Sequence, residues 1–291
     1  PLKRGVLPQA PEAPPVPAME TKSIVEQLVH GYDDEGGYFV RGKRFLVRFT
    51  PIGDLDFYRY DGVELFVDSP RFNFWRALTD NDRGLANFIP GLLRWLVPLH
   101  WREATGQQQI TDFPVHPEPD GIITVHLLLK IPGIKGRAEL AYTIHADGSM
   151  RILAALHPRR PMLRLGLTFA MPGAFRHVCY FGRGPHENMP DRKQGALMGV
   201  YRTDADGMLH DYVRPQENGN RCDVRWAVLT DAAGKGLRLG MVDELGAPFH
   251  LGVHPYTLEE LESARHIDEL PRHRFLMVDV DHFQSGAHFD F

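Results

Sequence analysis

Three segments of the chain are dense in polar side chains that could do chemistry. They span residues 71–84, 180–192 and 215–226, and each mixes Arg with Asp or Glu, side-chain amides and a nearby aromatic ring. Amides and charged groups hydrogen bond hydroxyls, while an aromatic face covers the C–H side of a sugar ring. The same residue types also satisfy the backbone of long loops packed on a sheet, so a structural role competes with a binding role. Together the segments favour a polar groove.

Two glutamates in these segments, Glu187 and Glu217, are the candidates for a catalytic carboxyl pair, and each stands beside an Asn. Glycoside hydrolysis needs two carboxyl groups about 5 to 10 Å apart across the scissile bond. His186 with Glu217 could instead act as acid and base for opening a sugar ring. Sequence spacing does not set these distances, so both pairings stay open.

The sequence contains little that indicates a metal site or a catalytic thiol. The fifteen histidines are scattered, and no H-E-x-x-H or Cys/His pairing occurs. The densest cluster, His282 and His288 with Asp279, Asp281 and Asp290, has no recognised ligand spacing. Cys222 has no evident base partner. We therefore expect neither a metal site nor a catalytic thiol.

Composition excludes several classes of protein. The 291 residues include 33 Lys and Arg against 37 Asp and Glu, for a net charge of −4 and no basic run, which argues against nucleic-acid binding. No stretch approaches 18 consecutive apolar residues, so no membrane span is expected. Two cysteines cannot form a disulfide framework, which favours reduced thiols in a cytoplasmic protein.

The elements that must position these residues are mostly strands. Runs rich in Val, Leu, Ile, Phe and Tyr alternate with polar residues, and Asp-Gly dipeptides at 61–62, 120–121 and 147–148 indicate hairpin turns. This pattern predicts a β-sandwich. The predicted strands are residues 38–49, 122–131, 137–144, 150–156, 163–171, 224–229 and 237–241.

Two short helices are also predicted. Residues 90–97 carry leucines on one face between Pro90 and Pro98, and residues 257–265 begin with a capping box of Thr257 and Glu260. Six prolines in the first twenty residues predict an extended tether, and the missing initiator Met favours a chain cut from a longer one.

The polar segments resemble signature blocks of the C-terminal domain of family 2 β-galactosidases, a domain also found as the small subunit of two-chain enzymes. Residues 74–82 read F-W-R-A-L-T-D-N-D against the family block F-W-R-A-P-T-D-N-D. Residues 182–192 resemble G-R-G-P-x-E-N-Y-P-D-R, with Met189 at the aromatic position. Residues 215–226 resemble P-Q-E-N-G-N-R-x-D-V-R-W, and residues 254–266 resemble H-Y-T-x-E-D-L-x-x-A-x-H.

The resemblance runs from Gly37 to the C-terminus in family order. It implies a large antiparallel β-supersandwich, similar to galactose mutarotase, over residues 37–291, with residues 1–36 as a proline-rich linker and lead-in. In the family, the catalytic carboxylates belong to a separate (β/α)₈ barrel of about 250 residues, where Mg and Na are expected to bind. The resemblance therefore implies no catalytic residue, metal ligand or cofactor in this chain.

The resemblance also implies that this domain closes one wall of a galactoside pocket. The implied substrate-binding residues are Trp75, Arg76, Asp80, Asn81, Asp82, His186, Glu187, Asn188, His288 and Asp290. The last two lie in residues 281–291, which track a family loop D-x-x-x-x-G-x-G-x-D-D-S-W. His288 replaces the second glycine, and the sequence ends before the Trp that stacks on the sugar in the family.

The expected function is the C-terminal domain or small subunit of a cytoplasmic β-galactosidase, which hydrolyses terminal β-galactosides such as lactose. Its expected partners are the remaining domains or a large subunit, the galactoside, and further copies in an oligomeric whole enzyme. Two alternatives remain: a freestanding mutarotase-like epimerase using His186 and Glu217, and a scaffold domain without sugar contact. Trp75 and Trp226 are predicted to be core aromatics.

Overall fold

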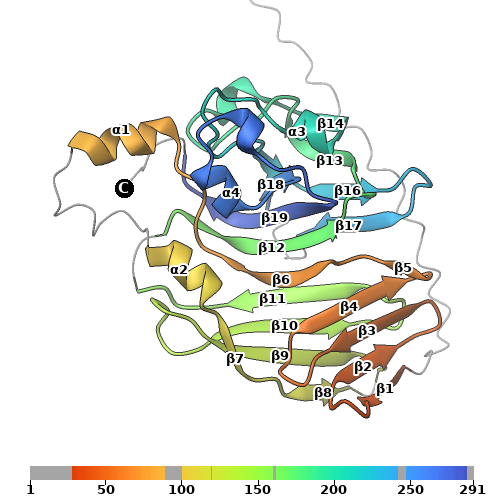
Figure 1. Ribbon diagram of the computed structural model, residues 1–291. Coiled ribbons are helices and arrows are strands. Elements are labelled where there is room, and N and C mark those ends of the chain that lie inside the picture. The colour runs from red at the N-terminus through yellow and green to blue at the C-terminus, as the bar shows by residue number, and fades with distance from the viewer. Residues whose placement is uncertain (1–27, 89–99, 119, 160–161, 242–246, 287–291) are drawn as a thin grey trace, which may run out of the picture.

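Strands dominate the structure, a computed structural model that describes residues 28–88, 100–118, 120–159, 162–241 and 247–286. Every strand pairing in these ranges is antiparallel, so the predicted all-β antiparallel class is confirmed. Nineteen described strands form four sheets, and the helices between them are few and short (Figure 1).

Two sheets lie in the upper half of Figure 1. The first has the order β15-β18-β19-β12-β6 and the second the order β14-β13-β16-β17. Their bounds are β6 Asp68–Asn73, β12 Arg164–Pro172, β13 His177–Gly184, β14 Leu197–Asp204, β15 Arg221–Val224, β16 Trp226–Thr230, β17 Gly236–Gly240, β18 Phe249–His254 and β19 Phe275–Gln284.

The other two sheets lie in the lower half of Figure 1. One runs β1-β2-β3-β4-β5, and the other runs β11-β10-β9-β7 with β8 paired to β9. Their bounds are β1 Val29–Tyr32, β2 Tyr38–Arg41, β3 Phe45–Phe49, β4 Leu55–Tyr60, β5 Val63–Glu64, β7 Gln109–Asp112, β8 Val115–Pro117, β9 Ile123–Lys130, β10 Ala138–Ile144 and β11 Met150–Ala155. Strand β1 falls within the predicted lead-in and pairs with β2.

Most predicted strands are confirmed, and two predicted runs are each divided. The run 38–49 forms a hairpin of β2 and β3, because the chain turns at Gly42. The run 224–229 is divided at Arg225 between β15 and β16, which belong to different sheets. The predicted Asp61-Gly62 turn is confirmed: both residues have positive φ, 47° and 75°, as a two-residue type I′ turn requires.

The predicted capping box is confirmed in helix α4, Leu258–Ser263. Thr257 Oγ1 accepts a hydrogen bond from the Glu260 amide at 3.2 Å, and the Thr257 amide donates to Glu260 Oε2 at 2.8 Å. The predicted helix at 90–97 lies outside the described residues. Three helices were not predicted: α1 Asp80–Phe88, α2 His100–Gly106 and α3 Ala205–Met208.

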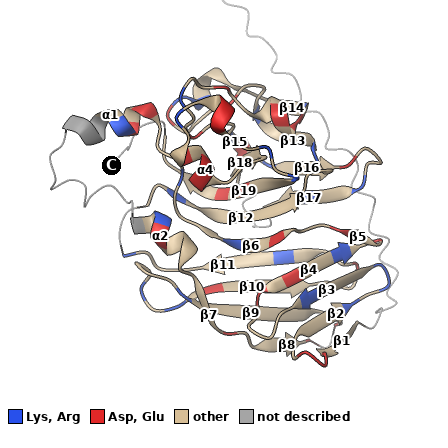
Figure 2. Ribbon diagram, in the orientation of Figure 1, with Lys and Arg blue, Asp and Glu red and all other residues tan. Residues whose placement is uncertain are grey.

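The core is apolar, and Trp75 and Trp226 belong to its buried residues as predicted, with 4% and 6% of their surface exposed. The guanidinium of Arg102 lies over the Trp75 ring at 5.0 Å. Basic and acidic residues are interspersed in Figure 2, in keeping with the small net charge. Within the described ranges, no helix has the length and apolar character needed to cross a bilayer.

One end of the sheet β15-β18-β19-β12-β6 gathers the polar segments. Strands β6 and β19 end there, while their antiparallel neighbour β12 begins there, so Arg164 is in register with Gln284 and Gly166 with Asn73. Residues 215–220, which lead directly into β15, also reach this end, since Gln284 donates a hydrogen bond to Glu217. The sheet topology therefore brings together segments that lie far apart in the sequence.

Candidate functional site

The three polar segments meet at a cavity of about 330 Å³, here called the polar pocket. Larger hollows, of about 370, 430 and 490 Å³, are lined mainly by residues outside these segments. The polar pocket is lined by Thr79, Asp80, Asn81, Met189, Arg192, Tyr212, Gln216 and Glu217. The expected polar groove is therefore present, and each segment contributes to it.

Gln216 and Asp80 join the first segment to the third. The Asp80 amide donates to Gln216 Oε1 at 2.9 Å, and Gln216 Nε2 donates to Asp80 Oδ2 at 3.2 Å. Gln216 is buried, whereas Asp80 and its neighbour Asn81 are exposed. The Asn81 amide has no hydrogen-bond partner among the described residues, so its donor and acceptor remain available at the rim.

Glu187 holds two of the lining side chains. It accepts hydrogen bonds from the Tyr212 hydroxyl, from Arg192 Nη2 at 2.5 Å and from the Gly219 amide at 2.8 Å. Burial alone would raise the pKa of Glu187, but these three donors outweigh it, and the pKa is lowered. Burial and the Glu187 carboxylate raise the pKa of Tyr212. Tyr212 is therefore a neutral donor to an ionised Glu187.

Arg76, within the first segment, is fully buried and binds two other parts of the chain. Its Nη1 pairs with Asp82 Oδ2 at 2.7 Å, and its Nη2 donates to the Gly286 carbonyl oxygen at 2.7 Å. Asp82 also accepts from the Thr79 amide at 2.9 Å. Arg76 therefore fixes the first turn of α1, which carries Asp80 and Asn81, to the end of β19.

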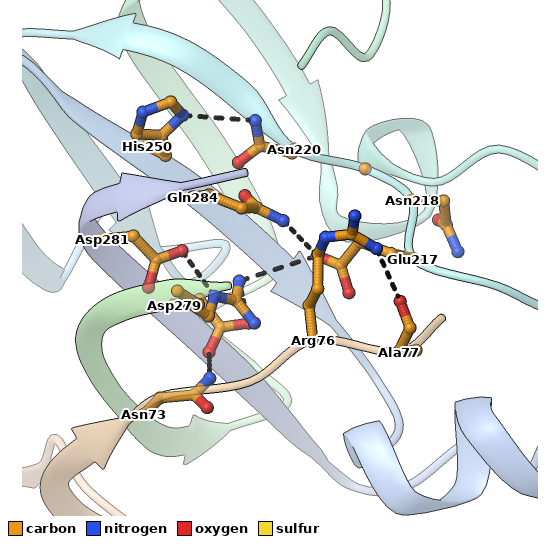
Figure 3. Close-up of polar contacts among 12 residues, drawn as sticks. Asn73, Arg76, Ala77, Glu217, Asn218, Asn220, His250, Asp279, Asp281 and Gln284 are labelled. Carbon is orange, nitrogen blue, oxygen red and sulfur yellow. Dashed lines mark hydrogen bonds and ion pairs between the residues drawn. The ribbon is translucent and has the colours of Figure 1, made fainter. Parts of the chain in front are cut away.

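Arg164 is the centre of a second buried cluster. Its Nε donates to Asp281 Oδ2 at 2.8 Å, and its Nη2 lies 3.4 Å from Asp279 Oδ2 and 3.7 Å from Glu217 Oε1. Glu217 Oε1 also accepts from Gln284 Nε2 at 2.9 Å (Figure 3). This cluster links the polar pocket, through Glu217, to the sheet beneath it.

Three carboxylates around one guanidinium leave the cluster short of positive charge. Burial and the negative charges of Asp279 and Glu217 raise the pKa of Asp281 to about 8, despite the attraction of Arg164. Burial would also raise the pKa of Asp279, but Arg164 and His254 outweigh it, and the pKa is lowered. The charges around Arg164 therefore favour the protonated form of Asp281 and the ionised form of Asp279.

The residues predicted to bind substrate are placed in different ways. Asp80 and Asn81 line the polar pocket, and Glu187 holds two of its lining residues. His186 is exposed. The buried members of the set are Trp75, Arg76, Asp82 and Asn188. His288 and Asp290 lie outside the described residues. Contact of these residues with a sugar stays a prediction.

The two glutamates of the proposed catalytic pairings take part in different hydrogen-bond networks. Glu187 binds Tyr212, Arg192 and the Gly219 amide, whereas Glu217 binds Gln284 beside Arg164. Among the described contacts, none joins Glu217 to Glu187 or to His186. What the pocket offers is a set of hydrogen-bonding groups for a ligand.

The described residues also show no side-chain arrangement suited to metal or thiol chemistry. Across the described ranges, no group of three or more His, Cys, Asp or Glu side chains is arranged to hold a metal ion. Cys179 and Cys222 are both free. Burial raises the pKa of Cys222 to about 12, which keeps it an unreactive thiol.

Sequence reasoning missed Tyr212, Arg192, Gln216 and Arg164 as site residues. Arg192 and Gln216 lie inside the singled-out segments, but nothing in their spacing distinguishes them from their neighbours. Tyr212 lies three residues before the third segment. Arg164 did carry a signal, since it is a lone charge at the start of an apolar strand run.

Comparisons with known proteins agree with the resemblance. Residues 41–288 match the family model of the β-galactosidase small chain. A β-galactosidase of Priestia megaterium is 33% identical over 97% of this chain and 26% of its own length. Those of Halalkalibacterium halodurans and Lactobacillus delbrueckii subsp. bulgaricus are 30% and 31% identical, over 90% and 82% of this chain and 25% and 23% of their own lengths. The chain thus spans about a quarter of the curated relatives it matches.

Proposed function

The chain belongs to the β-galactosidase small-chain family, and on that premise we propose that it is the C-terminal domain or small subunit of a larger β-galactosidase. The whole enzyme would hydrolyse terminal β-galactosides such as lactose. The observation that carries this proposal is the family match over residues 41–288, in a chain that covers only a quarter of its relatives.

The chain alone is proposed to be non-catalytic. Its two conspicuous glutamates serve separate hydrogen-bond networks, which supports the assignment of the catalytic carboxylates to another part of the enzyme. The same part, a (β/α)₈ barrel in this proposal, would bind the Mg and Na ions. This chain would then need no cofactor of its own.

Its contribution would be a wall of the galactoside pocket together with contacts to the other domains. We propose that the polar pocket forms this wall, with Asp80 and Asn81 at its rim. Glu187 would act by holding Tyr212 and Arg192 in place. Trp75, Arg76, Asp82 and Asn188 would stabilise the loops from below, and His186, His288 and Asp290 would complete the sugar-facing side.

The finer description of the fold is also a proposal. Four antiparallel sheets in two tiers support a β-supersandwich similar to that of galactose mutarotase. Residues 37–291 would form this domain, and residues 1–36 would connect it to a preceding domain, with β1 as a strand of the lead-in.

The partners follow from the same premise. We propose that the chain binds the remaining β-galactosidase domains or a large subunit, and that the whole enzyme is an oligomer. Two free cysteines support a reducing, cytoplasmic compartment.

The proposal is tested by association. The remaining polypeptide is expressed with a tag, and the untagged chain is added to it. We expect the chain to co-elute with the remainder as a stable complex that hydrolyses a chromogenic β-galactoside. A remainder that folds and hydrolyses at full rate without binding the chain would overturn the proposal.

A further inference from the structure

We propose that a second cavity, here called the histidine pocket, binds a small neutral molecule with an aromatic ring and one hydroxyl group, such as a phenol. The ligand hydroxyl would donate a hydrogen bond to His254. The cavity has a volume of about 370 Å³, at the small end of ligand sites. It shares no lining residue with the polar pocket, so the inference goes beyond the proposed function.

The histidine pocket lies on one face of the sheet that contains β18, β19, β12 and β6. His254 of β18 is in register with Met277 of β19, which is in register with Ala170 of β12. Ala170 is in turn in register with Asp68 of β6. Residues directly opposite each other on antiparallel strands share a face, so these four side chains form a row across the sheet. Leu258, the first residue of α4, lines the same pocket.

His254 is buried and its ring is oriented by Asp279. Its Nε2 lies 2.9 Å from Asp279 Oδ2, and the two side chains are 2% and 1% exposed. Asp279 Oδ1 accepts a hydrogen bond from Asn73 Nδ2 at 3.3 Å, which fixes the carboxylate (Figure 3). Because the ionised form of Asp279 is favoured, it accepts from His254, and we assign the proton of the neutral ring to Nε2.

The other ring nitrogen of His254 is available to a ligand. Among the contacts of the described residues, none involves His254 Nδ1. The ring is also stacked on Tyr256, with centroids 5.6 Å apart and planes 5° apart, so its direction is set before a ligand binds. In the assigned tautomer Nδ1 is an acceptor, and a buried acceptor without a donor costs free energy. A ligand hydroxyl would supply the donor.

The apolar walls of the histidine pocket suit an aromatic ring. Leu258, Phe275 and Met277 are half-buried and line it. Phe275 is held by stacking on His273, with centroids 4.5 Å apart. Methionine sulfur makes favourable contacts with aromatic rings, and its flexible side chain adapts to their shape. A ring placed against these walls would bury apolar surface while its hydroxyl reaches His254.

The charges around the histidine pocket favour a neutral ligand. Asp68 is paired with Arg71, and Asp279 lies 3.4 Å from Arg164 Nη2. Glu259 is exposed, so solvent screens its charge. An ionised ligand of either sign would lose hydration against the apolar walls, with no unpaired buried charge to offset that loss. A neutral hydroxyl does not carry this cost.

The test is a fluorine NMR titration of the full chain with para-fluorophenol. We expect the wild type to bind it saturably. para-Fluoroanisole, in which a methyl group replaces the hydroxyl hydrogen, should have a Kd roughly tenfold higher because it cannot donate to His254. para-Fluorobenzoate and para-fluorobenzylamine, an anion and a cation at neutral pH, should also bind more weakly than the phenol.

Two variants locate the binding. Val67→Trp adds a bulky ring at an exposed lining residue and should raise the Kd of para-fluorophenol at least tenfold with little change in Tm. Val213→Trp, at a side chain that is 89% exposed and does not line the pocket, is the matched control and should leave the Kd unchanged. His254→Phe should bring the Kd of the phenol to that of the anisole. If His254→Phe does not fold, Val67→Trp and the ligand series still decide.

Several results would overturn the inference. Equal Kd values for the phenol and the anisole would show that no ligand hydroxyl donates to His254. Tighter binding of the benzoate or the benzylamine would show that the pocket selects a charge. A titration that does not saturate, or equal Kd values in Val67→Trp and Val213→Trp, would show that no ligand occupies this pocket. These measurements need only the chain itself, so each outcome leaves the proposed function standing.

Discussion

Asp80 and Gln216 lie 136 residues apart in the sequence and exchange two hydrogen bonds, at 2.9 and 3.2 Å. This exchange closes the polar pocket, because Asp80 starts helix α1 and Gln216 lies in the segment that leads into β15. The rim of the pocket therefore depends on a long-range contact between the first and third polar segments.

Replacing Gln216 by Ala should destabilise the protein. Both hydrogen bonds to Asp80 are lost and a partner is left unsatisfied, so we expect the free energy of unfolding to fall by about 1–3 kcal/mol. Urea denaturation measures it. Gln107→Ala, a change at an exposed residue, is the control, and its effect should stay within about 0.5 kcal/mol. Equal stability of both variants would show that the exchange contributes nothing.

Gly286→Ala should disturb the end of β19. A Cβ at this position would lie 2.5 Å from Asp191 Cγ, so the chain must move and strain the Arg76 bond to the Gly286 carbonyl. Overpacking of this kind costs about 1–3 kcal/mol. Gly195→Ala is the control, because a Cβ there meets nothing within 4 Å. If thermal unfolding gives both variants the wild-type Tm, residue 286 is not packed as described.

The Asp281 carboxyl should make stability depend on pH. Its pKa is raised in the folded protein to about 8, so its stabilising contribution is complete below the unfolded value of 3.8 and is lost as pH rises to about 8. Between these two values the free energy of unfolding falls by about 1.4 kcal/mol per pH unit. His250, whose pKa burial lowers to about 4, acts in the opposite sense below pH 6.5.

The free energy of unfolding is therefore compared between the wild type and Asp281→Asn from pH 6.5 to 9. This variant mimics the protonated carboxyl. Its amide oxygen can still accept from Arg164. We expect the stability of the variant, relative to the wild type, to rise across this range and level off above pH 8. Parallel pH profiles of the two proteins would show that Asp281 is ionised throughout.

Trp75→Ala should be among the most damaging single changes. The ring is buried in the core, with Arg102 over its face, and truncation of such a residue costs roughly 3 to 5 kcal/mol. Val213→Ala, at a side chain that is 89% exposed, is the control for loss of apolar volume. An unshifted urea midpoint for Trp75→Ala would contradict the assignment of Trp75 to the core.

The strands could be predicted from the sequence because their pattern is local. The run at 163–171 and the turn at Asp61-Gly62 are set by residues next to one another. Helix α1 was not predicted, although its first turn has a local signal: the Asp82 amide donates to Thr79 Oγ1 at 3.2 Å, and the Thr79 amide donates to Asp82 Oδ2 at 2.9 Å, as in a capping box. What the sequence does not show is the tertiary part, in which Arg76 pairs with Asp82 and also donates to the Gly286 carbonyl oxygen.

The candidate site, like the fold, could be predicted from the sequence only in part. The three polar segments were visible in sequence, and they do converge on one pocket. Which residues face the pocket was not visible, since Arg76 and Asn81 are equally polar but one is fully buried and the other exposed. Nor was the buried cluster visible, since the pairing of β12 with β19 places Arg164 within hydrogen-bond distance of Asp281, 117 residues away in the sequence.

We propose that this chain completes a β-galactosidase but does not hydrolyse galactosides itself. The most direct measurement is the hydrolysis of a chromogenic β-galactoside by the chain alone, by the remaining polypeptide alone, and by their mixture. We predict activity in the mixture and none in the chain. Hydrolysis by the chain alone would contradict the account, and Glu187→Gln and Glu217→Gln would then be the first variants to make.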